Sequence, residues 1–253
     1  MKKYIINIIF LLFIIISAIS RADSNSIMQT ANEYYKNNRY QLAIEEYNKL
    51  ILDGFEGTSL YYNLGNAHYR LGKVGYAILY YEKALKLSPN DEDVKHNLAL
   101  AKLNLQDKVD TLPPFFIFNL WEGLLASFSV TGWTIIVYIV FILLLIVSLA
   151  YFFSRNVSEQ RISFFSGAGL AIALVFAIIL LVVKMNKEYN VKDGIIVETA
   201  VVVKSSPDYS SKDSFQIHEG LKVTLEDQVD NWVKIRLNDG KIGWISEKSI
   251  EII

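Results

Sequence analysis

The part of the chain that follows residue 23 alternates apolar and polar positions with a helical period, and this pattern repeats. Ala43 and Ala77 lie 34 residues apart, and Tyr47 recurs as Tyr81 at the same interval. A repeat of about this length is typical of helix pairs that stack into a solenoid, because one pair cannot bury its apolar face alone. The pattern therefore predicts an all-α array of the kind that holds other proteins.

Two longer apolar segments, 133–153 and 162–183, carry no charged residue. Each is close to the roughly 20 residues that cross a bilayer as a helix. The stretch between them is long enough only for a hairpin turn. We therefore predict transmembrane helices at 131–153 and 162–184, joined by a turn at 154–161.

Residues 1–22 have the pattern of a signal peptide. Two lysines precede an apolar run from Tyr4 to Ile19, and the small residues Ser20 and Ala22 have the spacing that a signal peptidase favours. An uncleaved anchor helix is the alternative, because the run is near the upper length for a signal peptide. In either form this leader exports the segment that follows it.

The leader also sets the predicted orientation of the hairpin. The distribution of positive charges alone does not determine this orientation, because Arg155 and Arg161 in the turn are balanced by lysines after the second span. Export of residues 23–110 places the turn in the cytoplasm and returns residues 185–253 to the outer side. We therefore expect a protein of the bacterial inner (cytoplasmic) membrane, embedded in the lipid bilayer, with both soluble parts periplasmic or otherwise outside the cytoplasm.

Residues 111–130 separate the repeats from the first span. Pro113 and Pro114 end the preceding helix, because proline cannot continue one. Large apolar residues then recur at spacings of three and four: Phe115, Phe118, Trp121, Leu125 and Phe128. This spacing predicts a helix that lies in the membrane interface. A simple extension of the first span is the alternative.

The repeat region, residues 23–110, resembles the tetratricopeptide repeat. Its second copy, 58–91, matches the signature positions of that repeat at Leu64, Gly65, Tyr69, Ala77, Tyr81, Ala84 and Pro89. The first copy, 24–57, matches less closely, and a single helix from Glu92 caps the array. The small Gly65 predicts a close crossing of two helices.

The inner helices of such an array face a concave groove. We predict that a protein partner binds there, to side chains selected by the helical register: Asn32, Tyr35, Lys36, Tyr62, Asn66, Tyr69, Arg70 and His96. Aromatic and amide groups with few cations suit an extended peptide or a partner's tail. In the alternative, Tyr62 and Tyr69 only pack between repeats.

Two other roles are not predicted for this groove. Tetratricopeptide domains that grip a terminal carboxylate resemble one another in carrying cations at positions that are Met28, Asp93 and Asn97 here, so a carboxylate clamp is not supported. His68 falls on a packing position, and we expect it in the core.

From Gly194 onward, short alternating apolar runs broken by turn residues predict a small all-β barrel. Residues 185–253 resemble a bacterial SH3-like domain in the segments HEGLKV, WVKI and DGKIGWI. The resemblance implies binding of cell-wall peptide or of a neighbouring protein, with a contact surface at Tyr209, Phe215 and Trp232. In the alternative, Trp232 is mostly core and the domain docks on its own chain. Trp244 is expected in the core.

The composition of the chain argues against several classes of partner and activity. The net charge of -1 suggests neither nucleic acid nor a polyanionic surface as a partner. The chain has no cysteine, which excludes disulfides, thiolate metal sites and thiol catalysis. The three histidines, His68, His96 and His218, lie far apart, and no catalytic or metal-binding motif is present. We therefore predict no catalytic residue, no metal, no cofactor and no enzymatic activity.

The predicted architecture is a multidomain membrane protein: an all-α tetratricopeptide solenoid, a two-helix transmembrane hairpin and a C-terminal small all-β SH3-like barrel. This order of parts resembles the BatE family of the Bacteroides aerotolerance operon, and the segments KHNLALAK and VVKSSPDYSSKDSFQIHEG support the likeness.

The family resemblance implies a non-enzymatic membrane scaffold that mediates protein-protein interaction. Its implied partners are membrane proteins with von Willebrand A domains and a MoxR-type ATPase complex, and its implied role is envelope integrity under oxidative stress. The alternative is a cell-wall sensor or anchor that binds peptidoglycan through the SH3-like domain, while the repeats serve as a spacer.

Overall fold

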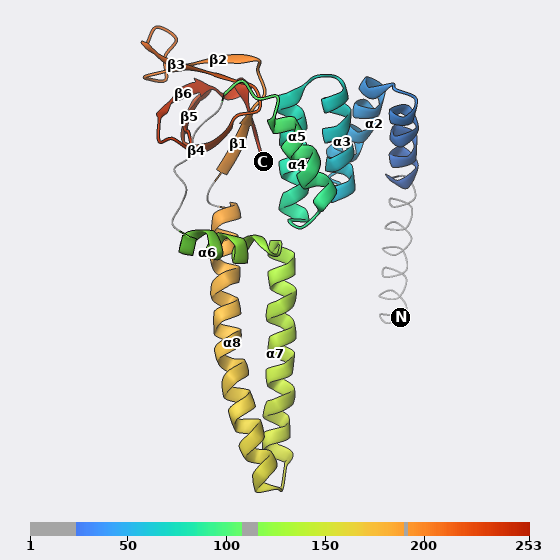
Figure 1. The fold of residues 1–253 in the computed structure, drawn as a ribbon, viewed down its shortest axis with the longest axis vertical. Coiled ribbons are helices and arrows are strands. Elements are labelled where there is room, and N and C mark those ends of the chain that lie inside the picture. The colour runs from blue at the N-terminus through green and yellow to red at the C-terminus, as the bar shows by residue number, and fades with distance from the viewer. Residues whose placement is uncertain (1–23, 108–115, 190–191) are drawn as a thin grey trace, which may run out of the picture.

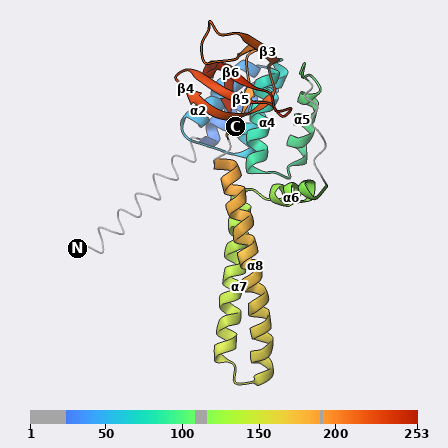
Figure 2. The same ribbon diagram turned by 90° about the vertical axis from the view of Figure 1, so that its left-hand side faces the viewer.

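A computed structural model describes residues 24–107, 116–189 and 192–253. The predicted signal peptide, residues 1–22, lies outside the described residues, as do Pro113, Pro114 and Phe115. The described chain forms a helical array, a helical hairpin and a β domain. The array and the β domain lie side by side at the same end of the hairpin (Figures 1 and 2).

The helical array begins with a helix at residues 24–36. It continues with α2 (Tyr40–Leu52), α3 (Thr58–Arg70), α4 (Val74–Leu87) and α5 (Glu92–Lys102). Tyr47 and Tyr81, which share a position in the repeat, are both fully buried. A Cβ atom at Gly65 would lie 2.5 Å from the ring of Tyr81, so only glycine allows this ring to fill the helix crossing.

The hairpin consists of α7 (Val130–Phe153) and α8 (Val157–Tyr189), and α6 (Phe116–Ala126) lies across its upper end in Figure 1. The indole Nε1 of Trp133 donates a hydrogen bond to the carbonyl oxygen of Leu125, 3.3 Å away. Both residues pack with Leu180 of α8 in one buried cluster, which fixes α6 to the hairpin. By length and composition, α7 and α8 are suited to crossing a membrane.

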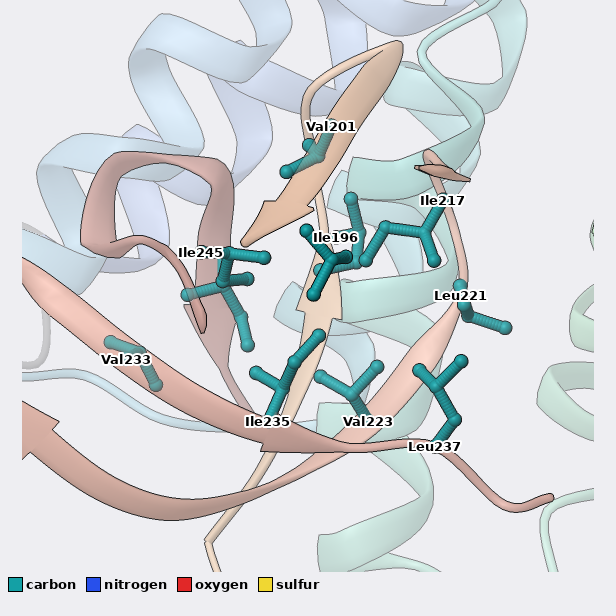
Figure 3. Close-up of a cluster of buried hydrophobic side chains, with 11 residues drawn as sticks. Ile196, Val201, Ile217, Leu221, Val223, Val233, Ile235, Leu237 and Ile245 are labelled. Atoms are coloured by element: carbon teal, nitrogen blue, oxygen red, sulfur yellow. The ribbon is translucent and has the colours of Figure 1, made fainter. Parts of the chain in front are cut away.

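The β domain is one antiparallel sheet with the strand order β3-β2-β6-β5-β4-β1-β7. Its strands are β1 (Lys192–Ile196), β2 (Ala200–Lys204), β3 (Asp213–His218), β4 (Lys222–Val229), β5 (Trp232–Arg236), β6 (Ile242–Ser246) and β7 (Ile250–Ile252). The sheet curls around a core of branched aliphatic side chains, among which Ile196, Ile235 and Ile245 lie close together (Figure 3).

One detail of this core differs from the sequence prediction. Ile245 is fully buried, and successive side chains of a strand point to opposite faces. Trp244 therefore points away from the core and is only half-buried. Gly243 takes the inward position before Ile245, where a Cβ atom would lie 2.4 Å from Val203. The fold class itself, with a helical array, two long apolar helices and a small β domain, is confirmed.

Candidate partner-binding site

A cavity of about 440 Å³ opens on the inner face of the helical array. The side chains that line it are Tyr35, Tyr62, Asn66, Tyr69, Arg70, Tyr81, Asn97 and Leu100. We call this cavity the groove. Its walls come from the first helix, α3, α4 and α5, so it spans both repeats and the capping helix.

The groove contains most of the side chains that the helical register predicts. Tyr35, Tyr62, Asn66, Tyr69 and Arg70 all line it. Three predicted residues do not line the groove: Asn32, Lys36 and His96. Lys36 and His96 are exposed outside the lining, and Asn32 is half-buried within a hydrogen-bond network of the first repeat.

Asn66 holds the floor of the groove together. Its Oδ1 accepts hydrogen bonds from the hydroxyl of Tyr81 at 2.7 Å and from Nδ2 of Asn97 at 2.8 Å. Nδ2 of Asn97 is also 3.1 Å from the hydroxyl of Tyr62. Burial raises the pKa of Tyr81, so its hydroxyl keeps the proton that it donates. Asn66 therefore orients neighbouring side chains, rather than presenting its carbonyl oxygen to a partner.

The same network recurs one repeat earlier. Oδ1 of Asn32 accepts from the hydroxyl of Tyr47 at 2.6 Å and from Nδ2 of Asn63 at 3.1 Å. In both copies the tyrosine lies 15 residues after the accepting asparagine. The donating asparagine lies 31 residues after the same accepting asparagine. The partner-binding residues selected by register omit Asn97, although the comparison with carboxylate-gripping tetratricopeptide domains placed it in the groove and the shared offset of 31 residues also points to it.

The rim of the groove remains available to a partner. Arg70 and Tyr69 are exposed, and Tyr35 and Tyr62 are half-buried. Ring faces beside a guanidinium group suit the apolar and acidic side chains of an extended peptide.

His68 lies behind the groove wall and not in it. Only 6% of the residue is exposed, and its ring stacks on Tyr76 and Tyr80 with centroid distances of 5.1 and 5.3 Å. Burial, and to a smaller extent the charge of Lys73, lowers the pKa of His68 to about 4. The imidazole is therefore neutral at pH 7 and packs in the core.

The aromatic surface predicted for the β domain is smaller than expected. Tyr209 is 74% exposed and lies against Trp232, with ring centroids 4.7 Å apart. Trp232 is only 8% exposed, and Phe215 packs against the barrel core from a half-buried position. The exposed aromatic surface therefore consists of the ring of Tyr209, which packs on the buried ring of Trp232.

The β domain docks on the outer face of the helical array. Ile195 of β1 is fully buried in the same apolar cluster as Ile78 of α4. The backbone amide of Gly75 donates to the Glu219 carboxylate at 3.0 Å, which places a negative charge at the positive end of α4. A Cβ atom at Gly75 would lie 2.8 Å from the carbonyl oxygen of Ile196. The two domains are thus in direct backbone contact.

Charged side chains also form ion pairs and hydrogen bonds between the array and the β domain. Glu82 of α4 accepts from Lys102 at 2.8 Å and from Lys222 of the β domain at 3.2 Å. Burial works against the charge of Glu82, but the two ammonium groups outweigh it and lower the pKa of this carboxyl. Asp107, beyond α5, accepts from the backbone amide of His218 at 2.6 Å and lies 2.9 Å from its Nδ1.

Comparison with known proteins identifies the class of each soluble part. The tetratricopeptide repeat family model matches residues 59–91, and the bacterial SH3 domain family model matches residues 199–251. No curated protein gives a significant match to the chain. A repeat of the protein-interaction type joined to a bacterial SH3 domain supports a scaffold or anchor role.

Proposed function

We propose that this chain is a non-enzymatic, membrane-anchored scaffold whose groove binds an extended segment of a protein partner outside the cytoplasm. The observation that carries the proposal is that α4 contacts the β domain with one face and lines the groove with the other. Gly75, Ile78 and Glu82 contact the β domain, whereas Tyr81 turns toward the groove. The docked β domain therefore braces the array from outside and leaves the groove open.

A capture experiment tests the groove. The full chain, carrying an affinity tag, is purified from native membranes in mild detergent as wild type and as the double variant Tyr69→Ala with Arg70→Ala. Both changed side chains are at the exposed rim, so we expect loss of the co-purifying partner without loss of the fold.

The matched control carries Lys49→Ala with Leu52→Ala, an exposed cation and an exposed apolar side chain outside the groove. This control is expected to retain the partner. If the rim variant captures the same proteins in the same amounts as wild type, the groove is not the binding site.

Two observations support anchoring in a membrane, which we propose is the bacterial inner membrane. Helices α7 and α8 are long enough to span a bilayer, and large apolar side chains such as Ile146 and Ile172 are exposed on them. A bilayer would cover these side chains. The array and the β domain lie at one end of the hairpin, so a spanning hairpin would hold both on the same side, which we propose is the outer one (Figure 2).

The order of the parts supports a finer proposal. We propose that the chain acts as BatE-like proteins are expected to act, with membrane proteins carrying von Willebrand A domains and a MoxR-type ATPase complex as partners. Its role would be to keep the envelope intact under oxidative stress. A strain that lacks the chain should survive oxygen exposure poorly and recover with the wild-type chain but not with the rim variant. Unchanged survival of the deletion strain would contradict this role.

Peptidoglycan binding by the β domain is the second candidate, and the exposed ring of Tyr209 on Trp232 favours it. A supported aromatic face is a suitable platform for an apolar sugar or peptide surface. Tyr209→Ala should then reduce co-sedimentation of the full chain with purified wall sacculi. Val202→Ala removes an exposed apolar side chain of the same domain and serves as the control. Equal sedimentation of all three proteins would exclude this candidate.

A further inference from the structure

A basic cavity lies where the soluble parts meet the hairpin. Its volume is about 540 Å³, and its walls come from α4, α6, α8, β1, β4 and β7. Five lysines line it, against three side-chain carboxylates and the main-chain end at Ile253. We call it the junction cavity. It is separate from the groove, since the two share no lining residue.

The carboxylates do not neutralise all of these lysines. Lys222 pairs with Glu82, and Lys184 pairs with Glu188. Lys192 has no carboxylate partner within the described parts of the chain. Lys86 donates to the main-chain oxygen of Ile253, the last residue of the sequence, at 3.2 Å. The cavity therefore carries an excess of positive charge that suits an anion.

The position of α6 indicates which anion this is. Phe118 and Leu120 of α6 are 61% and 65% exposed, although Leu125 of this helix packs on the hairpin and Ser127, directly after it, accepts a hydrogen bond from Asn90 of the array. Ala126 at the end of α6 lines the junction cavity, so the cavity is level with this exposed apolar helix. Apolar helices that lie flat at the end of a span mark the level of the lipid headgroups.

We propose that the junction cavity binds the headgroup of an anionic phospholipid, with its phosphate between Lys86 and Lys192. This inference rests on the proposed anchoring of α7 and α8 in a membrane. Leu85 and Pro89 line the same cavity and give the glycerol and upper acyl carbons an apolar wall that a free phosphate ion would not use. Lysines just beyond a membrane helix attract anionic lipids in this way.

The test is native mass spectrometry of the full chain in mild detergent, with equimolar phosphatidylglycerol and phosphatidylethanolamine. Wild type is expected to retain the anionic lipid in several-fold excess. Lys86→Gln with Lys192→Gln should lower this retention by about 25-fold, since each lysine near a lipid surface contributes roughly fivefold and the two factors multiply. Lys86→Arg with Lys192→Arg should restore it. Lys212→Gln with Lys241→Gln changes two exposed lysines outside the cavity and should have no effect.

Each result decides the proposal. Equal retention of the two lipids by wild type, or unchanged retention in the Lys86→Gln and Lys192→Gln variant, overturns it. Displacement of the lipid by millimolar inorganic phosphate, with phosphate bound in its place, would also overturn it by making the free ion the ligand. Incorporation of the same proteins into lipid nanodiscs is scored separately. Failure to incorporate would contradict the membrane anchor, whereas incorporation without lipid preference contradicts only the junction cavity.

Discussion

At the residue scale, the buried polar groups of the array stabilise it by pairing with one another. Asn66→Ala would remove the shared acceptor of Tyr81 and Asn97 and leave both donors without it. We expect the unfolding free energy to fall by about 1–3 kcal/mol, which is the usual cost of an unsatisfied buried donor. Urea unfolding of the full chain in detergent, followed by far-ultraviolet circular dichroism, measures the change.

Asn37→Ala is the control for this measurement, because Asn37 is exposed in the turn after the first helix. Its unfolding midpoint should match that of wild type. A variant at Asn66 that is as stable as this control would show that the asparagine network contributes nothing to stability.

His68 makes the array sensitive to acid. Its pKa of about 4 in the folded chain lies below the ordinary 6.5, so the unfolded chain takes up the proton first as the pH falls. The stability from the neutral ring is complete above pH 6.5 and is lost toward pH 4. Between pH 7 and pH 5 the expected loss is about 2 kcal/mol.

The change His68→Phe keeps an aromatic ring between Tyr76 and Tyr80 but cannot titrate. Its unfolding free energy should therefore decline less between pH 7 and pH 5 than that of wild type. His96→Gln removes an exposed imidazole and should decline as wild type does. Parallel pH profiles for wild type and His68→Phe would mean that His68 does not cause the acid sensitivity.

At the element scale, the contact between the β domain and the helices depends on a turn before β4. Gly220 has φ +84°, and a Cβ atom there would lie 2.4 Å from Leu105 and 2.9 Å from Ile78. Gly220→Ala should push the turn away from the array. Hydrogen exchange of the full chain should then show faster exchange at the start of α4 and the end of α5.

A second glycine separates this steric effect from backbone strain. Gly240 has nearly the same backbone angle, φ +89°, but nothing lies within 4 Å of its Cβ position. Gly240→Ala should cost about 1 kcal/mol through the backbone alone and leave exchange in α4 and α5 unchanged. If both variants accelerate exchange in these helices equally, Gly220 does not hold the interface.

Periodic elements were predictable from the sequence, and single contacts between distant elements were not. A period of 34 residues and the pair Gly65 and Tyr81 suffice to predict stacked helices. The hydrogen bond between Gly75 and Glu219 joins residues 144 apart and belongs to no repeating pattern. Docking of the two domains is therefore only an alternative at the level of the sequence, whereas the structure contains it. For the groove, the register predicted Tyr35 of the first helix and the four lining side chains of α3. It did not select Tyr81 of α4 or Asn97 and Leu100 of α5.

At the scale of the whole molecule, the orientation in the membrane can be measured directly because the chain has no cysteine. Single-cysteine variants Asn37→Cys, Lys212→Cys and Ser158→Cys place one thiol on the array, on the β domain and at the start of α8 beside the hairpin turn, all at exposed positions. With a membrane-impermeant maleimide, the first two should react once the outer membrane is permeabilised. Ser158→Cys should react only after the inner membrane is broken, and the reverse pattern would contradict the proposed orientation.

The docking of the β domain on α4 also has a mechanical consequence. The array precedes the hairpin in the chain and the β domain follows it, so the array is joined to α7 and the β domain to α8, at the same end of the helix pair. Because Glu82 and Lys222 join the two domains, a pulling force on a partner in the groove divides between α7 and α8. The load then reaches the hairpin through two parallel paths, and neither helix can tilt or rotate without straining the contact above it.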